Sequence, residues 1–332
     1  MTDPSRAKEV LAGLEQRARR RFGQHFLTDT GIVDRIVRGA RVGPGDPVIE
    51  IGPGLGVLTS ALLATGARVS AIELDRDLAA YIRATYPAVE LIEADALKVD
   101  WAEVCRGGGY KVVANLPYNV GTTVTMQLVR RPELFRSITV MLQLEVVQRM
   151  CAEPGSKTFG ALSVELQARA QTTFLLKVPS DRFHPRPKVE SAVLRIEPYA
   201  EARTGGATPA QFDQVVRAAF SQRRKTLLNA VGARFGREIA AAALARAGVD
   251  SGLRAEQLGL DEFRAVAAAL SVLGLRPAES DRSAGSHPAE LSVLGLRPAE
   301  LSVLGLRPAE SSDASPSGGP SDDAEDGTAV DS

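Results

Sequence analysis

The amino-acid sequence predicts an α/β domain with a mostly parallel sheet, then a small all-helical domain and a disordered tail. Three observations predict this organisation. Short apolar segments alternate with amphipathic segments over residues 1–200, which is typical of βαβ units. Residues 201–275 then carry helical signals only. In residues 276–332, a repeat with proline in every copy cannot form a continuous helix or bury one face.

The composition is compatible with a folded core and excludes several classes of protein. Of 332 residues, 44% are hydrophobic and 24% are charged, and no apolar run reaches the ~18 residues of a membrane span. Residues 1–21 are polar and Arg-rich without an apolar signal segment. We therefore expect a cytoplasmic protein that does not bind membranes. Because Cys105 and Cys151 lie far apart and the chain has three histidines, we expect neither a disulfide framework nor a metal site.

The first domain is predicted as alternating strands and helices after a basic N-terminal arm. Its expected strands are Pro47–Ile51, Arg68–Leu74, Val89–Ala94, Lys111–Ala114, Ser137–Leu142, Phe174–Val178 and Ser191–Ile196. Amphipathic segments at Leu55–Ala64 and Arg76–Thr85 are the expected helices between the first strands. A helix or a long connection separates the early strands, which favours a parallel sheet.

The helical domain is predicted to begin after a linker at Tyr199–Pro209. Thr208 followed by Pro209 is a helix start signal, with Thr as the N-cap and Pro in the first turn. Three or four helices are expected, the last at about Asp261–Leu273. These helices make the domain of residues 201–275.

The negative charge of the tail cancels the positive charge of the rest of the chain. The decamer LSVLGLRPAE occurs at Leu270–Glu279, Leu291–Glu300 and Leu301–Glu310. Residues 276–332 hold four Arg against eleven Asp and Glu, a balance of −7, so the remaining residues carry +7 in a chain of zero net charge. A basic body is compatible with a polyanionic partner.

A glycine-rich segment marks the first candidate site. Glu50–Gly56 reads Glu-Ile-Gly-Pro-Gly-Leu-Gly and lies where a strand gives way to a helix. Its glycines let the backbone approach a ligand, and the helix start offers unpaired N–H groups. The segment departs from the dinucleotide pattern, whose third glycine would fall at Val57. Taken alone, the segment is a weak signal that NAD, FAD and S-adenosylmethionine proteins share, and this departure makes NAD the weaker alternative.

Two carboxylates at later strand ends favour a nucleoside cofactor without a pyrophosphate. Glu73 ends the second strand and can accept hydrogen bonds from ribose hydroxyls. Asp95 follows the third strand and can accept one from an adenine amine. Ligands of open α/β sheets bind outside the carboxyl ends of the strands, so we expect both side chains at one crevice with the glycines.

The tetrapeptide Asn115-Leu-Pro-Tyr118 follows the fourth strand and is the candidate reaction site. An exocyclic adenine amine is a poor nucleophile because its lone pair is delocalised into the ring. The Asn115 side-chain oxygen and the Leu116 carbonyl can each accept one amine N–H, which directs the lone pair at an electrophile. Pro117 stiffens the loop, and the Tyr118 ring can stack on a base.

These motifs together resemble the ribosomal RNA adenine N6,N6-dimethyltransferases, in particular the bacterial small-subunit type. The resemblance rests on Gln24–Leu27, Glu50–Gly56, Glu73, Asp95, Asn115–Tyr118, Phe183–Val189 and Phe220–Asn229. It covers about residues 21–270, and several motifs in order are far more specific than any one of them. The resemblance implies a Rossmann-like fold and S-adenosyl-L-methionine (SAM) as the cofactor.

The resemblance also implies roles for individual residues. Contacts to SAM would come from His25, Leu27, Gly52, Gly54, Glu73, Asp95 and Asn115. The catalytic residues would be Asn115, Leu116, Pro117, Tyr118 and Phe183, with Phe183 holding the target adenine opposite Tyr118. Relatives often carry Asn where this chain has His25. For Phe183, a place in the hydrophobic core is an equally good prediction.

A basic group is the expected RNA contact. Its members are Lys188, Arg217, Arg223, Arg224 and Lys225. Arg217, Ser221 and Arg224 have the spacing of one helix face, from which phosphate contacts position RNA without reading its sequence; such a cluster is otherwise a solvated surface.

The substrate implied by the resemblance is a pair of adjacent adenosines in a hairpin loop near the 3′ end of 16S rRNA. They would be modified late in small-subunit assembly, within the subunit or its precursor, by a monomer. One alternative is a 23S rRNA adenine N6-methyltransferase that confers macrolide resistance. Another is a non-catalytic RNA-binding assembly factor.

Overall fold

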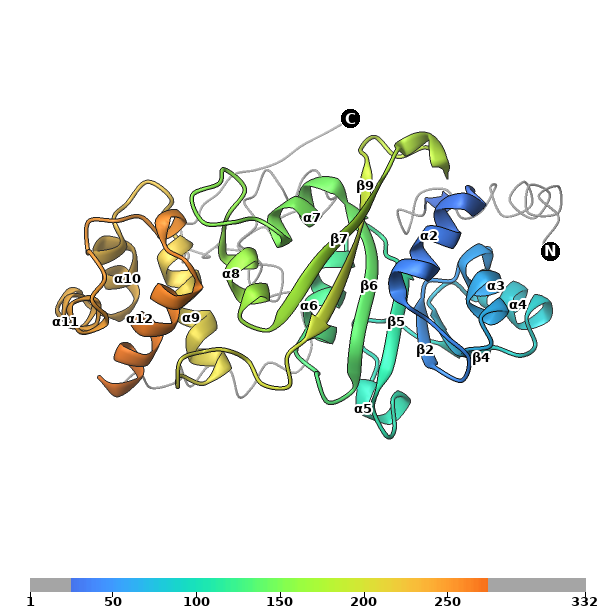
Figure 1. Ribbon diagram of the computed structural model, residues 1–332, viewed down its shortest axis with the longest axis horizontal. Helices are drawn as coiled ribbons and strands as arrows, with labels where there is room; N and C mark the ends of the chain where they lie inside the picture. The colour runs from blue at the N-terminus through green and yellow to red at the C-terminus, as the bar shows by residue number, and fades with distance from the viewer. Residues whose placement is uncertain (1–24, 274–332) are drawn as a thin grey trace, which may run out of the picture. The chain divides into compact units, whose positions relative to one another are not determined.

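A computed structural model describes residues 25–273, whose central element is a seven-stranded sheet of order β4-β3-β2-β5-β6-β9-β7 (Figure 1). Strands β2 to β6 are parallel, whereas β9 is antiparallel to both β6 and β7. A separate antiparallel pair joins β1 to β8. The strands are β1 (Phe26–Leu27), β2 (Pro47–Ile51), β3 (Arg68–Glu73), β4 (Glu90–Glu93), β5 (Tyr110–Asn115), β6 (Phe135–Gln143), β7 (Ala170–Val178), β8 (Phe183–His184) and β9 (Ser191–Pro198).

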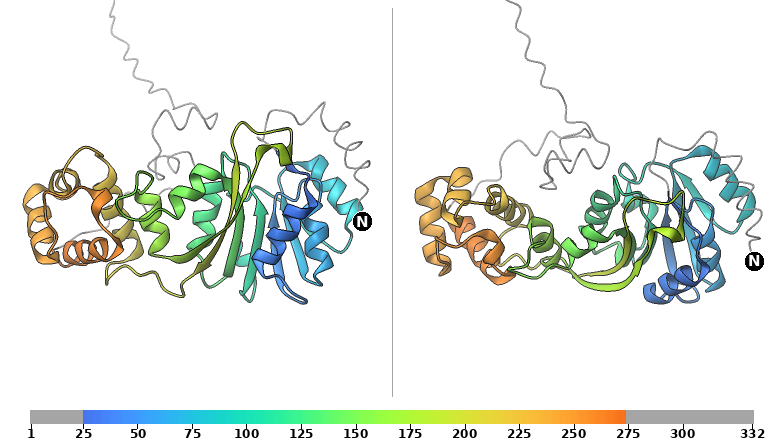
Figure 2. Two further views of the ribbon diagram at one scale, coloured as in Figure 1. Left: turned by 45° about the horizontal axis from the view of Figure 1, so that its top comes forward. Right: turned by 90° about the horizontal axis from the view of Figure 1, so that it is seen from above.

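Helices cover both faces of this twisted sheet (Figure 1, Figure 2). The helices up to β9 are α2 (Thr30–Ala40), α3 (Val57–Ala64), α4 (Arg76–Thr85), α5 (Trp101–Val104), α6 (Gly121–Val129), α7 (Leu144–Met150), α8 (Ala161–Gln167) and the 3₁₀ turn η1 (Ser180–Arg182). After β9 come α9 (Pro209–Phe220), α10 (Leu227–Phe235), α11 (Arg237–Ala247), the 3₁₀ turn η2 (Ala255–Gln257) and α12 (Leu260–Val272). The predicted alternation of strands and helices is confirmed.

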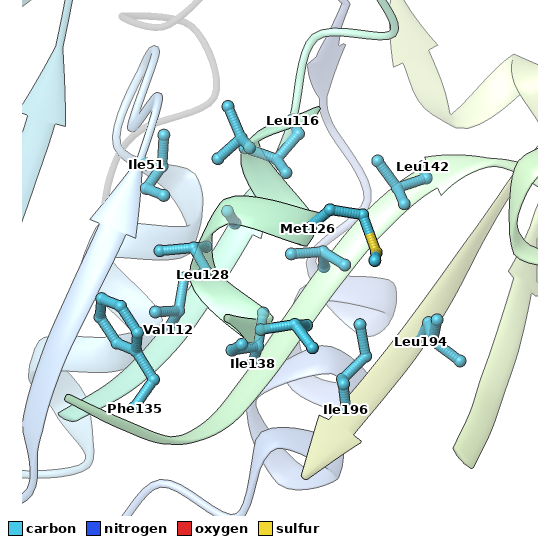
Figure 3. Packing of buried hydrophobic residues seen from close by; sticks show 14 of the residues in the cluster. Ile51, Val112, Leu116, Met126, Leu128, Phe135, Ile138, Leu142, Leu194 and Ile196 are labelled. Atoms are coloured by element: carbon cyan, nitrogen blue, oxygen red, sulfur yellow. The ribbon is translucent and has the colours of Figure 1, made fainter. Parts of the chain in front are cut away.

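The sheet is buried on both faces because its strands are apolar at consecutive positions. Val48 packs with α2 and α3 on one face, and its neighbour Ile49 packs on the other, as expected when successive side chains of a strand point to opposite faces. Figure 3 shows Phe135 and Ile138 among the fully buried side chains of the second face, which α6 covers. Burial of one such side chain stabilises the fold by about 1.5–3 kcal/mol.

A separate hydrophobic cluster holds the C-terminal helices together. Phe212, Phe263 and Leu270 are fully buried in it, and Val164 of α8 belongs to it as well. The core of the helical domain therefore also includes side chains from before residue 200. The domain boundary near residue 200 stays a prediction.

The start of α9 agrees with the prediction, but its end does not. The Thr208 hydroxyl accepts a hydrogen bond from the Gln211 amide, and Pro209 opens the helix. The helix ends at Phe220, with Ser221 as its C-cap, so the prediction that Arg224 extends one helix face is wrong. The N-terminal arm and the repeat tail lie outside the described residues. Within residues 25–273, no helix is long and apolar enough to cross a bilayer.

Gly56 gives a first testable prediction, because its position excludes a side chain for two reasons. Its φ is +75°, and an added Cβ would lie 2.2 Å from Cε2 of Tyr86. Gly107 has a similar φ of +86° but nothing within 4 Å of an added Cβ. Left-handed backbone costs about 1–2 kcal/mol for an L-residue, and the contact with Tyr86 adds about 1–3 kcal/mol.

Urea unfolding of Gly56→Ala and Gly107→Ala should therefore show a clearly larger loss of stability for Gly56→Ala. Equal losses for the two variants would contradict the packing of Gly56 against Tyr86.

Candidate active site

The carboxyl ends of four parallel strands meet at one edge of the sheet. Ile51 of β2 is in register with Ile72 of β3 on one side and with Ala114 of β5 on the other. The segments that follow these strands therefore lie together. This is the position where open α/β sheets bind ligands, and the candidate site consists of the segments that follow these strands.

The glycine-rich loop between β2 and α3 lines the site. Gly52, Gly54 and Gly56 all have positive φ, at 69°, 56° and 75°. An added Cβ at Gly54 would lie 3.0 Å from the Phe26 ring. The loop thus turns sharply and brings bare backbone to the cavity, as a nucleoside-binding loop requires.

Glu73 is held in place by backbone N–H groups at the end of β3. Its Oε1 accepts hydrogen bonds from Leu74 and Asp75, each at 2.9 Å, and its Oε2 lies 3.4 Å from the Gly54 nitrogen. Burial raises the pKa of Glu73, although these three hydrogen bonds oppose the shift. The carboxylate is therefore an oriented acceptor beside the glycine loop. Asp95 follows β4, lines the same cavity and accepts a hydrogen bond from Leu97 at 3.0 Å.

Glu50 is a site residue to which the sequence analysis assigned no role. Its side chain is buried and accepts a hydrogen bond of 2.6 Å from the Thr59 hydroxyl. Burial raises the pKa of Glu50 to about 8, while the Thr59 hydrogen bond opposes the shift and the Glu73 charge adds to it. The signal available in sequence was an acidic residue inside an otherwise apolar strand.

This shifted pKa predicts how stability depends on pH. Since the pKa of Glu50 is about 8 in the folded state and 4.5 ordinarily, the folded state binds more protons than the unfolded state between these values. Stability should therefore fall as pH rises from about 5 to 8, and Glu50→Gln should flatten this slope. Urea unfolding at pH 5, 6, 7 and 8 measures the effect, with Glu103→Gln on the exposed surface as control. Identical slopes for wild type and Glu50→Gln would refute the assignment.

Asn115 ends β5, and its amide has one defined orientation. Its Nδ2 donates a hydrogen bond of 3.1 Å to the main-chain carbonyl of His25. A carbonyl can only accept, so the nitrogen must occupy that position and Oδ1 is left as an acceptor. The side chain therefore presents to a substrate the atom that the reaction-site hypothesis needs.

Hydrogen bonds hold the rest of the Asn115–Tyr118 loop. The Pro117 carbonyl accepts hydrogen bonds from Val120 and Gly121 and so leads into α6. The Tyr118 hydroxyl lies 2.7 Å from the Ser191 hydroxyl on β9, and burial raises the pKa of Tyr118. Tyr118 is therefore a neutral, fixed ring beside Asn115.

One cavity of about 220 Å³ collects nearly all of the predicted cofactor and catalytic residues. It is lined by His25, Leu27, Gly52, Gly54, Glu73, Asp95, Asn115, Leu116, Pro117 and Tyr118. Further lining side chains that the sequence analysis did not assign include Phe26, Glu50, Leu74 and Asn119. Leu74 is 51% exposed although it is apolar, and such an exposed apolar side chain beside a polar site is a common ligand contact.

Phe183 does not line this cavity, contrary to its predicted place opposite Tyr118. It is 4% exposed, pairs with Leu27 across β1 and β8, and packs with Leu176 and Val178 in the core. The physical reason is the pairing of β1 with β8, a two-stranded ribbon that directs the Phe183 side chain into the hydrophobic core. In this structure Phe183 supports β1, the strand that directly follows His25.

Arg217 differs from the other predicted RNA contacts because it pairs with two carboxylates of the same molecule. Its Nε lies 3.1 Å from Oε1 of Glu165, and its Nη2 lies 3.9 Å from Asp213. Its charge is thus compensated by two carboxylates where α8 meets α9, while a third of the side chain stays exposed. The expectation that Arg217 presents its charge on a shared helix face is wrong.

The remaining basic residues lie on exposed segments. Arg223, Arg224 and Lys225 occupy the turn between α9 and α10, and Lys188 is exposed in the proline-rich loop, residues 183–189. Arg223 also donates a hydrogen bond to the Lys157 carbonyl at 3.1 Å, which connects this turn to the exposed loop between α7 and α8. Within residues 25–273, no group of three or more His, Cys, Asp and Glu could hold a metal ion.

Comparison with known proteins agrees with this geometry. The family model for ribosomal RNA adenine dimethylases matches residues 15–271. The chain belongs to this family. Among its relatives, the ribosomal RNA small subunit methyltransferase A of Syntrophotalea carbinolica is 44% identical over 75% of this chain and 96% of that protein. The protein of the same name from Bordetella bronchiseptica is 45% identical over 77% and 96%.

Solved structures of adenine dimethylases and related enzymes share the fold of this family member. A dimethyladenosine transferase from Plasmodium falciparum has a TM-score of 0.63 and 25% identity, covering 73% of this chain and 96% of its own. The 23S rRNA methyltransferase ErmE has a TM-score of 0.59 and 27% identity, covering 74% and 99%. The Rossmann-like fold predicted from the sequence is confirmed.

Proposed function

We propose that this protein is a SAM-dependent methyltransferase that dimethylates the N6 amines of two adjacent adenosines near the 3′ end of 16S rRNA. Its substrate would be a hairpin loop in the small ribosomal subunit or its precursor, modified late in assembly by a cytoplasmic monomer. The orientation of Asn115, whose Nδ2 is bound by the His25 carbonyl, is the observation that carries this proposal.

The chemistry follows from that orientation. An amine nitrogen becomes nucleophilic when acceptors bind its N–H groups and its lone pair is no longer delocalised into the π system of the ring. Oδ1 of Asn115 is one acceptor and the neighbouring Leu116 carbonyl is the second. Both acceptors interact more strongly with the pyramidal nitrogen of the transition state than with the planar ground state. The Tyr118 ring, held by Ser191, provides a surface for the base.

The residues at the sheet edge fit SAM, which supplies the methyl group on a sulfonium when bound. The glycines approach a ligand with bare backbone, and the carboxylates of Glu73 and Asp95 can accept from ribose hydroxyls and an adenine amine. We propose that His25, Leu27, Gly52, Gly54 and Asn115 complete these contacts. The buried charge of Glu73 favours a ligand with hydrogen-bond donors over a phosphate.

Small-subunit rRNA is favoured over 23S rRNA by the relatives. Proteins named for the small subunit are 43–45% identical to this chain, whereas ErmE is 27% identical. The exposed turn with Arg223, Arg224 and Lys225, together with Lys188, would contact phosphates.

Methyl transfer from radiolabelled SAM tests the proposal. Wild-type protein would be incubated with unmethylated small subunits, naked 16S rRNA and 23S rRNA, and the digested products resolved as mono- or dimethyladenosine. We expect dimethyladenosine in small subunits. Label in 23S rRNA alone would indicate a 23S rRNA adenine N6-methyltransferase of the macrolide-resistance class. SAM binding without any label would favour a non-catalytic assembly factor.

Reversing one exposed charge in the α9–α10 turn should weaken substrate binding. Arg224→Glu should raise the Kd for small subunits and reduce the slope of log K against log salt by about 1, the contribution of one phosphate contact. Arg106→Glu, at an exposed position whose ion pair is with the i,i+3 residue Glu103 at 3.6 Å, is the matched control. Filter binding at several salt concentrations measures both. Equal salt slopes for the two variants would show that this turn does not contact RNA.

A further inference from the structure

His25 connects three parts of the site through three different groups. Its carbonyl accepts the hydrogen bond from Asn115, its Nδ1 lies 2.7 Å from the Pro185 carbonyl, and its ring centroid lies 5.6 Å from that of Tyr118.

The acceptor at Pro185 defines the protonation of the ring. Because a carbonyl only accepts, Nδ1 must carry the proton and donate it. This hydrogen bond lies at the exposed side of the half-buried His25, and together with the ring contact to Tyr118 it holds the imidazole in one orientation.

The β1–β8 ribbon makes this contact a link between two loops. Phe26 pairs with His184 and Leu27 with Phe183, and the Thr28 amide donates to the Arg182 carbonyl at 3.0 Å. Because His25 directly precedes β1, the ribbon links the position of His25 to that of the proline-rich loop. A displacement of that loop would move the carbonyl that orients Asn115.

We infer that His25 is a positioning residue that couples the proline-rich loop to the reacting groups Asn115 and Tyr118. This inference rests on the proposed methyl transfer. It assigns a role in the chemical step to the hydrogen bond from Nδ1–H of His25 to the Pro185 carbonyl. This role is separate from cofactor affinity. Substrate contact on the loop, where Lys188 is exposed, would stabilise the geometry in which Asn115 presents Oδ1.

Three substitutions separate this role from a cofactor contact. His25→Ala removes both side-chain contacts, His25→Asn keeps a donor N–H but loses the ring, and His25→Phe keeps a ring but loses the donor. Measured at saturating SAM and saturating small subunits, kcat should fall about tenfold or more in His25→Ala and His25→Phe, as expected for misplaced reacting groups. His25→Asn should restore most of the rate. A contact to SAM alone would raise the KM for SAM and leave kcat unchanged, and that result would overturn the inference.

Nuclear magnetic resonance gives a second readout that needs no substrate. Long-range ¹H–¹⁵N correlations of the ring should show His25 as the Nδ1–H tautomer, assigned among the three histidines by comparison with His25→Asn. An Nε2–H tautomer would overturn the inference. Absence of methyl transfer by wild type would instead refute the proposed function, and the tautomer would still test the contact with Pro185.

Discussion

Replacing Asn115 by alanine should reduce kcat for methyl transfer about 10²–10³-fold, the usual loss when one oriented hydrogen-bonding group is removed from a transition state. The substitution deletes Oδ1, the acceptor that the His25 carbonyl leaves available by binding Nδ2. Because the acceptor acts most strongly on the pyramidal nitrogen, the loss should appear at saturating substrate. The fold should be kept, since the side chain is only partly buried.

Asn115→Asp refines this test. The aspartate keeps an acceptor oxygen but cannot donate to the His25 carbonyl, so its oxygens would repel that carbonyl and the side chain would rotate. We expect a loss close to that of Asn115→Ala. Single-turnover rates with small subunits, calorimetric SAM binding and thermal melting would be measured for each variant. A rate within tenfold of wild type in Asn115→Ala would exclude Oδ1 as the essential acceptor.

Replacing Asp213 by alanine should have the largest effect on stability, about 3–5 kcal/mol, because it strips a buried charge of its partner. Asp213 of α9 lies 2.7 Å from the Arg169 guanidinium, whose side chain is 5% exposed. It also lies 3.6 Å from Arg130. Burial raises the pKa of Glu165, the second carboxylate of this group, so Glu165 is a poorer substitute for the lost partner.

An exposed ion pair in the same helical region is the matched control. Asp261 pairs with Arg264 at 2.8 Å, but its side chain is 87% exposed. Asp261→Ala should therefore change stability by less than about 1 kcal/mol. Urea unfolding of both variants measures the difference, and a loss below about 1 kcal/mol for Asp213→Ala would show that Arg169 finds another partner or water.

The strand ends could be predicted because they depend on local patterns and one general rule. Apolar runs that end at Ile51, Glu73 and Asn115 identify parallel strands, and the carboxyl ends of such strands converge at one edge. Glycines that follow a strand indicate a tight turn at a ligand. These signals need no knowledge of distant contacts, and the cavity contains nearly all of the residues they indicated.

Other assignments depended on pairs that are distant in sequence. The hydrophobicity of Phe183 is equally compatible with a base contact and with a core position, and its pairing with Leu27 decides for the core. Arg217 reads as a surface charge until Glu165, 52 residues away, is seen beside it. Glu50 reads as part of a motif, and only its burial gives it a shifted pKa.

The sequence by itself determined the α/β class, the helix start at Thr208, the family and the set of polar residues at the strand ends, because periodicity, capping and motif spacing are local properties. Only the tertiary structure decided that Phe183 lies in the core, that Arg217 pairs with Glu165, and that the His25 carbonyl orients Asn115 across 90 residues. Hydrogen bonds and burial between distant segments depend on the three-dimensional packing of the chain, and local patterns carry no record of it.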